Sequence, residues 1–307
     1  MILEKSFPAM GTVHTVTLFD AEGPEAASDA RAYLLDLHRA WSCFKEDSLV
    51  SRINQAAGRQ PVAVDEDTFE VLRQAKRYGR FTEGAFDVTV GPLADLWRRA
   101  MEERQLPGDE AVWQALALVN FANVTLDEEA HTVLLEKAGQ RIDLGGIAKG
   151  YVADRIREYL EGRGVKHAIL SFGGNIVAIG LKPDGSDWKV GIQDIDRPTC
   201  EYMLVSRNRG GSTVTSGIYE RGFDLDGVRY HHILSPENGM PVQNELASVT
   251  IFSENSMEGD ALSTTAFILG TEKGTALIDR LDGIEAVFIS RNREVTYSSG
   301  ARDWIIP

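Results

Sequence analysis

A carboxylate and a hydroxyl with helical spacing stand out in the last third of the sequence. The segment G-D-A-L-S-T-T contains Asp260 and Thr264 and is predicted to be helical, and residues four apart on a helix project from one face. Together they form a hard-oxygen pair suited to Mg²⁺, an ion that usually keeps positions open for phosphate oxygens and water. The plainer alternative is that Asp260 is an N-terminal charge or cap of its helix.

A glycine turn followed by a helix lies near the middle of the chain, within Gln140 to Ile156. We expect Asp143 to end a short strand, and Gly145 and Gly146 to adopt backbone angles that a Cβ atom would block. The next helix would offer unpaired N–H groups to a phosphate, and Lys149 in its first turn would add positive charge. The residue order matches neither a P-loop nor G-x-G-x-x-G, so an ordinary strand-to-helix turn is the alternative.

Two adjacent histidines lie in the segment V-R-Y-H-H-I-L-S-P, which is predicted to be a strand that runs into a turn. Strand alternation places His231 and His232 on opposite faces, with His232 on the face of Tyr230 and Leu234. One of the two rings could therefore serve as a general base toward a hydroxyl group. A surface or structural role is the alternative for either histidine.

Three further loops contain residues that could contact a ligand. The S-F-G-G-N segment from Ser171 to Asn175 joins two predicted strands, either as a plain hairpin or as a floor for a flat ligand. The E-G-A-F-D loop precedes a predicted helix that Asp87 or Thr89 could cap. Met10 lies in a small loop before the first predicted strand, as a core residue or as a soft contact on an aromatic ring.

The elements that must position these residues follow a mixed order. Apolar periodicity and capping residues predict helices at Ala26 to Phe44, Asp65 or Asp67 to Thr82, Thr89 to Arg104, Asp109 to Val119, Ile147 to Glu161, Met257 to Leu269 and Lys273 to Leu281. Strands are predicted at Val13 to Phe19, Val124 to Leu126, Val133 to Leu135, His167 to Ser171, Ile176 to Leu181, Trp188 to Gln193, Tyr202 to Ser206, Ser212 to Ser216, Val228 to Leu234, Ala247 to Phe252, Glu285 to Ile289 and Glu294 to Tyr297. Because this order lacks steady β-α alternation, α+β is favoured over a doubly wound sheet.

Composition limits the possible functions. The chain has 307 residues, 43% of them hydrophobic and 25% charged, which is typical of a globular protein with one domain or two closely packed lobes. The formal charge of −14 argues against nucleic-acid binding through a general basic surface. A phosphate-containing ligand would need a local cluster of donors or a metal instead.

The two cysteines and the N-terminus bear on the compartment. Cys43 and Cys200 are far apart in sequence and form neither a C-x-x-C motif nor a disulfide framework, which is compatible with a reducing compartment. The first residues lack the pattern of a signal peptide, and no window is long and apolar enough to span a membrane. We therefore expect a cytoplasmic protein with no membrane segment, and a periplasmic or membrane-anchored one only if a leader precedes this sequence.

Eight segments, taken together and in order, resemble the ApbE family, the FAD:protein FMN transferases. Each segment is modest, but together they span nearly the whole chain, which argues strongly against a chance match. The segments are A-M-G-T at Ala9 to Thr12, S-x-x-S-R-I-N at Ser48 to Asn54, G-A-F-D-V-T-V-G-P-L at Gly84 to Leu93, I-D-L-G-G-I-A-K-G-Y at Ile142 to Tyr151, S-F-G-G-N at Ser171 to Asn175, T-S-G-I-Y-E-R at Thr215 to Arg221, H-I-L-S-P-E-N-G-M-P at His232 to Pro241, and G-D-A-L-S-T-T-A-F-I-L-G at Gly259 to Gly270.

The resemblance implies a fold, a reaction and a partner. The fold would be a two-lobed α+β architecture related to the T-fold, formed by residues 1–307 as one catalytic domain, with FAD in a cleft between the lobes. The Mg²⁺-dependent enzyme would split the pyrophosphate of FAD, transfer FMN to a Thr or Ser hydroxyl of an acceptor protein, and release AMP. Acceptors in the family are flavin-carrying subunits of redox complexes, marked by a Ser/Thr-Gly-Ala-Thr-like segment.

The resemblance also implies roles for individual residues. The Mg²⁺ ligands would be the Gly146 carbonyl, Asp260 and Thr264, and the base for the acceptor hydroxyl would be His232. Phe44 stands where the family often has a tyrosine, so its contact would be stacking without a hydroxyl. The implied FAD contacts are Met10, Phe44, Ala85, Phe86, Asp87, Asp143, Lys149 and Leu234, the last through its backbone or by packing.

The sequence departs from the family pattern in two segments. Ser235 and Asn238 replace an acid and a threonine in the turn after His232, which bears on the geometry of that turn more than on the reaction. Gly259 and Ser263 differ from the common A-D-A-L-A-T, yet the residues expected to bind the metal are retained.

Two other functions are compatible with much of the same sequence. A Mg²⁺-dependent FAD pyrophosphatase would use water in place of the acceptor hydroxyl and form FMN and AMP. A non-catalytic flavin-binding protein would store or deliver FAD without turnover. The retained Asp260, Thr264 and Lys149 argue against the second of these.

Overall fold

The computed structural model describes residues 2–20, 23–196 and 201–307 and divides into two compact units. Unit 1 comprises Met1–His38, Ile147–Gly217 and Glu245–Pro307, whereas unit 2 comprises Arg39–Gly146 and Ile218–Asn244. The chain thus passes from unit 2 to unit 1 directly after Gly146, within the predicted glycine turn.

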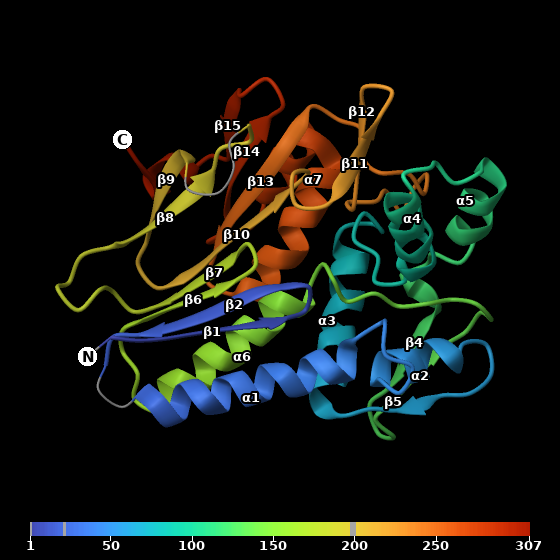
Figure 1. Cartoon of the computed structure of the whole chain (residues 1–307), viewed down its shortest axis with the longest axis horizontal. Coiled ribbons are helices and arrows are strands. Elements are labelled where there is room, and N and C mark those ends of the chain that lie inside the picture. The colour runs from blue at the N-terminus through green and yellow to red at the C-terminus, as the bar shows by residue number, and fades with distance from the viewer. Residues whose placement is uncertain (1, 21–22, 197–200) are drawn as a thin grey trace. The chain divides into compact units, whose positions relative to one another are not determined.

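Unit 1 is built on an eight-stranded sheet in the order β1-β2-β6-β7-β10-β13-β14-β15 (Figure 1). Each described pair of neighbouring strands is antiparallel, which confirms the α+β class and excludes a doubly wound parallel sheet. The strands are β1 Leu3–Ala9, β2 Thr12–Leu18, β6 Ala168–Phe172, β7 Asn175–Ile179, β10 Gly211–Gly217, β13 Leu246–Ser253, β14 Glu285–Ser290 and β15 Val295–Tyr297.

Three helices accompany this sheet: α1 Gly23–Trp41, α6 Ala148–Gly162 and α7 Ser256–Ile278. Helices α6 and α7 pack on each other, α6 also contacts β6 and β7, and α7 contacts β10, β13 and β14 (Figure 1). Gly270 interrupts α7 with non-helical angles (φ 78°, ψ 176°), which explains why the sequence predicts two helices here. The helix pair therefore buries one face of the sheet.

A second, three-stranded sheet in unit 1 has the order β16-β9-β8. Its strands are β8 Trp188–Gln193, β9 Tyr202–Asn208 and β16 Ile305–Ile306, the last preceded by the 3₁₀ helix η2 at Ala301–Trp304. Ile192 of β8 joins Phe252, Val287 and Ile289 of the large sheet in one core cluster, and the Phe252 ring stacks on Trp304. Every residue of β13 is buried, as expected for a strand that is covered on both faces.

Unit 2 contains four helices and two small sheets, which have the strand orders β3-β5-β4 and β11-β12. The helices are α2 Leu49–Gln55, α3 Glu66–Phe81, α4 Gly91–Glu103 and α5 Asp109–Leu116, with the 3₁₀ helix η1 at Phe121–Asn123. The strands are β3 Val62–Ala63, β4 Val124–Asp127, β5 Thr132–Leu135, β11 Gly222–Leu225 and β12 Val228–His231. Side chains cap two of the helices, Ser48 for α2 and Asp65 for α3.

Several predicted element boundaries are wrong. Strands β1 and β11 were not predicted. Because β1 precedes it, Met10 lies in the turn between β1 and β2 and not in a loop before the first strand. The predicted strand from Val228 to Leu234 ends at His231. Asp143 does not end a strand either, because this segment makes only an isolated bridge between Arg141 and Val90.

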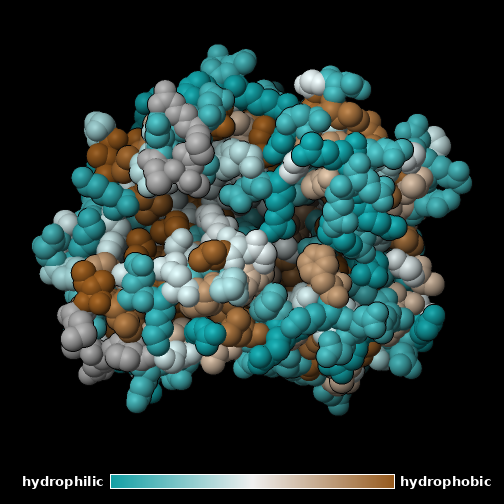
Figure 2. Space-filling model, viewed as in Figure 1, coloured by the Kyte–Doolittle hydropathy of each residue, from teal (hydrophilic) through white to brown (hydrophobic). Residues whose placement is uncertain are grey.

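None of the helices in the described part of the chain combines the length and the apolar character that a membrane span requires. On the face shown in Figure 2, hydrophilic residues predominate and hydrophobic residues form small, separate patches. Cys43 is a free thiol, and Cys200 lies outside the described residues.

Candidate functional site

Two of the predicted site residues meet in unit 1, where α6 begins beside α7. The Lys149 ammonium lies 3.3 Å from Asp260 Oδ1, and the Gly150 N–H donates a 2.9 Å hydrogen bond to Asp260 Oδ2. Asp260 is only 3% exposed, so its carboxylate depends on these partners. The expectation of unpaired N–H groups at the start of α6 is therefore wrong for Gly150, whose N–H already donates to the Asp260 carboxylate.

Hydroxyl groups surround the next turn of α7. Thr264 is half-buried, and its Oγ1 lies 3.3 Å from Ser216 Oγ of β10. Ser216 Oγ also lies 2.8 Å from Ser263 Oγ. Ser216 was not among the predicted site residues, although it lies in the T-S-G-I-Y-E-R segment that resembles the family. The carboxylate of Asp260 and these hydroxyls are all hard oxygens, so the residues present fit Mg²⁺.

Across the described residues, no group of three or more His, Cys, Asp or Glu side chains is arranged to hold a metal ion. A cation at Asp260 would thus take its remaining ligands from hydroxyls, carbonyls, water or substrate. This pattern suits Mg²⁺, which proteins often hold through one or two carboxylates while phosphate oxygens and water complete the shell.

A buried acid on α6, Asp154, was not predicted from the sequence. Asp154 accepts hydrogen bonds from the N–H groups of Ser256 and Met257, each at 2.8 Å. Burial raises the pKa of Asp154 to about 6, against the opposing effect of those two donors and of Arg157. The available signal was an acid amid the apolar residues Val152, Ala153 and Ile156.

Met10 occupies a tight hairpin turn in unit 1. Met10 and Gly11 both have positive φ (45° and 76°), as a two-residue hairpin turn of type I′ requires. The Met10 N–H donates to His38 Nδ1 at 3.2 Å, and His14 Nε2 lies 3.0 Å from the Ala9 carbonyl. A left-handed conformation costs a residue with a Cβ atom roughly 1–2 kcal/mol. The backbone of Met10 is therefore strained in this turn.

The Ala85–Asp87 segment of unit 2 is held by its own hydrogen bonds. Asp87 Oδ1 accepts the N–H of Thr89 at 2.7 Å and its hydroxyl at 2.6 Å, and Asp87 Oδ2 accepts the Phe121 N–H at 2.8 Å. Burial raises the pKa of Asp87, whereas these hydrogen bonds lower it. Neither Asp87 nor Thr89 caps α4, contrary to the sequence-based expectation, because Val90 is the N-cap residue and no side chain bonds there.

Phe86 is buried and its ring meets Tyr78 edge-on at 6.3 Å, whereas Ala85 is half-buried. The side chains of Phe86 and Asp87 therefore stabilise the fold of unit 2. Any contact that these two residues make with a ligand would come from their backbone.

The glycine turn is shaped by Asp143. Its Oδ1 accepts the Gly145 N–H at 2.7 Å, and its own N–H donates to the Val88 carbonyl at 2.8 Å. The prediction of unusual glycine angles was wrong, because neither Gly145 nor Gly146 has a positive φ. Gly145 is needed for close approach instead, since a Cβ there would lie 2.9 Å from Asp143 Oδ1.

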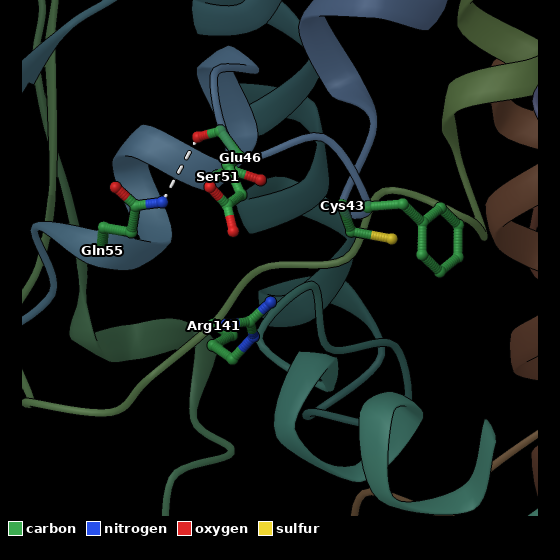
Figure 3. Close-up of a pocket in the computed structure, with 6 residues that line it drawn as sticks. Cys43, Glu46, Ser51, Gln55 and Arg141 are labelled. Carbon is green, nitrogen blue, oxygen red and sulfur yellow. Dashed lines mark hydrogen bonds between the residues drawn. The ribbon is translucent and has the colours of Figure 1, made fainter. Parts of the chain in front are cut away.

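A pocket of about 150 Å³ lies beside Phe44 in unit 2 (Figure 3). Phe44 is 71% exposed, and the Arg98 guanidinium carbon lies 5.2 Å from the centre of its ring. In Figure 3 the Arg141 guanidinium faces the pocket. The residues that line it are Cys43, Phe44, Glu46, Ser51, Gln55 and Arg141. The ring is thus accessible for the stacking contact that the family resemblance implies.

The two histidines differ in their surroundings, as strand alternation predicts. His231 is fully buried, and its Nε2 lies 2.8 Å from the Val242 carbonyl. His232 is exposed and lies beyond the end of β12, with its Nδ1 3.3 Å from the Arg221 carbonyl. A carbonyl only accepts, so this contact places the proton of the neutral ring on Nδ1 and leaves the lone pair on Nε2.

Ser235 and Asn238, the two departures from the family pattern after His232, each accept a hydrogen bond within the turn. Ser235 Oγ accepts the Glu237 N–H at 3.3 Å, and Asn238 Oδ1 accepts the Met240 N–H at 3.0 Å. Leu234 is 7% exposed and packs in the cluster around Leu93 and Trp97, so its side chain belongs to the core of unit 2.

The predicted site residues are distributed over both units. Met10, Lys149, Asp260 and Thr264 belong to unit 1. The other predicted residues belong to unit 2: Phe44, Ala85, Phe86, Asp87, Asp143, Gly146, His232 and Leu234.

Comparison with known proteins places this geometry in a family. The chain is 39% identical over 272 residues to a FAD:protein FMN transferase of Klebsiella pneumoniae (strain 342), which covers 88% of this chain and 81% of the relative. A FAD:protein FMN transferase of Treponema pallidum (strain Nichols) is 35% identical over 311 residues, or 96% of this chain and 86% of the relative.

Solved structures agree with this assignment. The crystal structure of the ApbE protein of Thermotoga maritima MSB8 superposes with a TM-score of 0.90 at 31% identity, over 100% of both chains. The flavin transferase ApbE of Vibrio cholerae superposes with a TM-score of 0.86 at 28% identity, over 99% of both chains. The sequence pattern of the ApbE family matches residues 10–288, and the chain therefore belongs to the ApbE family.

Proposed function

We propose that this protein is a FAD:protein FMN transferase, which moves the FMN part of FAD to a Thr or Ser hydroxyl of an acceptor flavoprotein and releases AMP. The meeting of Lys149, Gly150 and Asp260 in unit 1 supports the proposal most directly. It brings together an ammonium group that would bind phosphate and a carboxylate that would bind Mg²⁺, in a chain whose relatives are named for this reaction.

Asp260, Thr264 and the Gly146 carbonyl would hold Mg²⁺, and Ser216 adds a further oxygen beside Thr264. The bound ion would neutralise charge on the pyrophosphate and polarise the phosphorus under attack. Lys149 would contact the pyrophosphate oxygens and offset the charge that builds on them in the transition state.

His232 would act as the general base. The acceptor hydroxyl oxygen forms a bond to the FMN phosphorus, and the bond from that phosphorus to the bridging oxygen breaks, so that AMP leaves. The hydroxyl proton passes to His232 Nε2, the nitrogen that carries the lone pair when Nδ1 faces the Arg221 carbonyl. The exposure of His232 suits a hydroxyl on a macromolecular partner.

The remaining predicted residues would bind the flavin nucleotide. Phe44 would stack on a ring of FAD, and the Met10 thioether would contact an aromatic surface. The backbone of Ala85, Phe86 and Asp87 would contribute contacts, as would Asp143. Leu234 would support the site by packing.

The acceptor would be a flavin-carrying subunit of a redox complex with a Ser/Thr-Gly-Ala-Thr-like segment. The test is to incubate the protein with FAD and Mg²⁺, with and without an acceptor domain that contains such a segment. AMP release and the flavin fluorescence of the denatured acceptor are then measured.

The three candidate functions give different results in this experiment. AMP release only with the acceptor, together with a fluorescent acceptor band, would support the transferase. AMP and free FMN without acceptor would indicate a pyrophosphatase, and bound FAD without AMP would indicate a binding protein. An acceptor whose target Thr is replaced by Val is the matched control and should remain unlabelled.

A further inference from the structure

We propose that Asp154 of α6 is a positioning residue for Asp260 and Thr264, because it fixes the first turn of the helix that carries both. The inference rests on the proposed function, since it concerns the metal site assigned there. It adds a residue that touches neither the metal nor FAD.

The start of α7 is capped from another helix. Asp154 Oδ1 accepts the Ser256 N–H and Oδ2 accepts the Met257 N–H, each at 2.8 Å. The residue in the N-cap position of α7, Asn255, makes no capping hydrogen bond with its own side chain. The first N–H groups of a helix lack intrahelical partners, so Asp154 performs the task that a local N-cap residue usually performs.

Three residues on one face of α6 hold the segment around this cap. Gly150, Asp154 and Arg157 are spaced by four and three residues, so they project from the same face of the helix. Arg157 donates to the Glu254 carbonyl at 2.6 Å and to Asn255 Oδ1 at 3.0 Å.

The packing at the other end of this face is equally close. A Cβ atom on Gly150 would overlap the Ser256 carbonyl oxygen, and the Gly150 N–H reaches Asp260 itself. The helix that would contact the phosphate is thereby joined to the helix that would bind the metal at three successive turns.

The position of this turn determines where the proposed ligands lie. Asp260 follows Ser256 by four residues, and Thr264 follows by eight, on the same helix. A displacement of the first turn would move both oxygens together, and binding constellations tolerate only about 0.5 Å. Groups that orient metal ligands typically contribute about 10- to 100-fold to metal affinity.

The test compares the Asp154→Asn variant with Asp194→Asn, a matched control in the same unit. Asp194 is also buried, at 5% exposure, but its carboxylate pairs with Arg293 at 2.6 Å, away from α7. Binding of Mn²⁺ alone is titrated by the electron paramagnetic resonance signal of the free ion, with Asp260→Ala as the reference for a lost ligand. Amide hydrogen exchange of residues 254–262 is measured on the same samples.

We expect Asp154→Asn to weaken Mn²⁺ binding about 10-fold and to speed exchange in the first turn of α7, whereas Asp194→Asn changes neither. In turnover, the Mg²⁺ concentration at half-maximal rate should rise by a similar factor, and Asp154→Glu should recover part of the loss. A folded Asp154→Asn protein with unchanged Mn²⁺ affinity would overturn the inference. If Asp260→Ala loses Mn²⁺ binding in the same experiment, the proposed metal site still stands.

Two further outcomes are decisive. If Asp260→Ala also binds Mn²⁺ like the wild type, the metal assignment fails and the positioning role fails with it. If Asp154→Asn does not fold, Arg157→Gln takes its place in both measurements. This variant loses the contacts to residues 254 and 255, so binding should weaken about 10-fold, the lower end of the outer-shell range, and an unchanged affinity would refute the inference.

Discussion

Lys149 and Asp260 are 111 residues apart in sequence, yet their ammonium and carboxylate groups lie 3.3 Å apart in unit 1. The contact joins the helix after the glycine turn to the helix that carries the proposed metal ligands. A cation that binds Asp260 would break this ion pair, and so would a phosphate that binds Lys149. Either ligand would thus release the residue that binds the other. Metal and FAD binding should therefore favour one another through these two residues.

Replacement of Lys149 tests the phosphate-binding role. The Lys149→Gln variant should lower kcat/KM for FAD by about 10²- to 10³-fold, because a donor that stabilises transition-state charge is lost. Steady-state AMP release in the presence of acceptor measures this value. Lys189→Gln, at an exposed lysine of β8 in the same unit, should match the wild type. Equal rates for the two variants would exclude a role for Lys149 in turnover.

Replacement of His232 tests the general base. The His232→Gln variant should slow FMN transfer by about 10²- to 10⁴-fold while FAD affinity stays within about twofold, because the base acts on the acceptor hydroxyl. Single-turnover labelling of the acceptor and flavin fluorescence titration separate the two effects. His131→Gln serves as the control at a partly exposed histidine in unit 2. A parallel loss of FAD affinity in His232→Gln would instead indicate a binding role.

Close packing of α6 on α7 makes a prediction for two glycines of one helix. Gly150→Ala places a Cβ against the Ser256 backbone and should lower the free energy of unfolding by about 1–3 kcal/mol, as overpacking does. At Gly162 no described atom lies within 4 Å of an added Cβ, so Gly162→Ala should be neutral or stabilise by up to about 1 kcal/mol. Urea denaturation of both variants measures the difference. Equal stability of the two variants would contradict the described packing of the helix pair.

Local sequence patterns were sufficient for much of the fold. Apolar periodicity predicted α1 and α3 to α6, and the S-F-G-G-N segment forms the hairpin between β6 and β7. Asp260 and Thr264 indeed lie on one helix, as their spacing predicts. The strand β1, L-E-K-S-F-P-A, was missed because charged residues and Pro8 mask its alternation, which depends on pairing with β2.

The features that sequence could not provide depend on contacts between distant residues. Asp154 lies more than a hundred residues before the two residues whose N–H groups donate hydrogen bonds to it. The sequence around Asp154 therefore gives no indication of its capping role. Asp87 resembles a helix cap in sequence. Its Oδ2 instead accepts a hydrogen bond from the Phe121 N–H, which holds the loop away from the N-cap position of α4. The conformation of Gly145 likewise follows from the Asp143 side chain and not from a need for positive φ.

Cys43 provides a test by pH. Burial, together with the carboxylates of Asp143 and Asp95, raises the pKa of its thiol from 9.0 to about 11. The thiolate is the nucleophile, so at pH 8 iodoacetamide should react about 100-fold more slowly than with an ordinary thiol. The rate should rise about tenfold per pH unit between pH 7 and 9. Mass spectrometry of the Cys200→Ser protein measures Cys43 alone, and a rate that levels off below pH 9 would contradict the raised pKa.

Covalent transfer of FMN by this chain should depend on Asp260. The most direct measurement is the intact mass of an acceptor domain after incubation with FAD, Mg²⁺ and either the wild type or Asp260→Ala. The wild type should add the mass of one FMN less one water, at the Thr or Ser of the acceptor segment, and Asp260→Ala should add none. An acceptor that stays unmodified with the wild type, or is modified equally by Asp260→Ala, would contradict it.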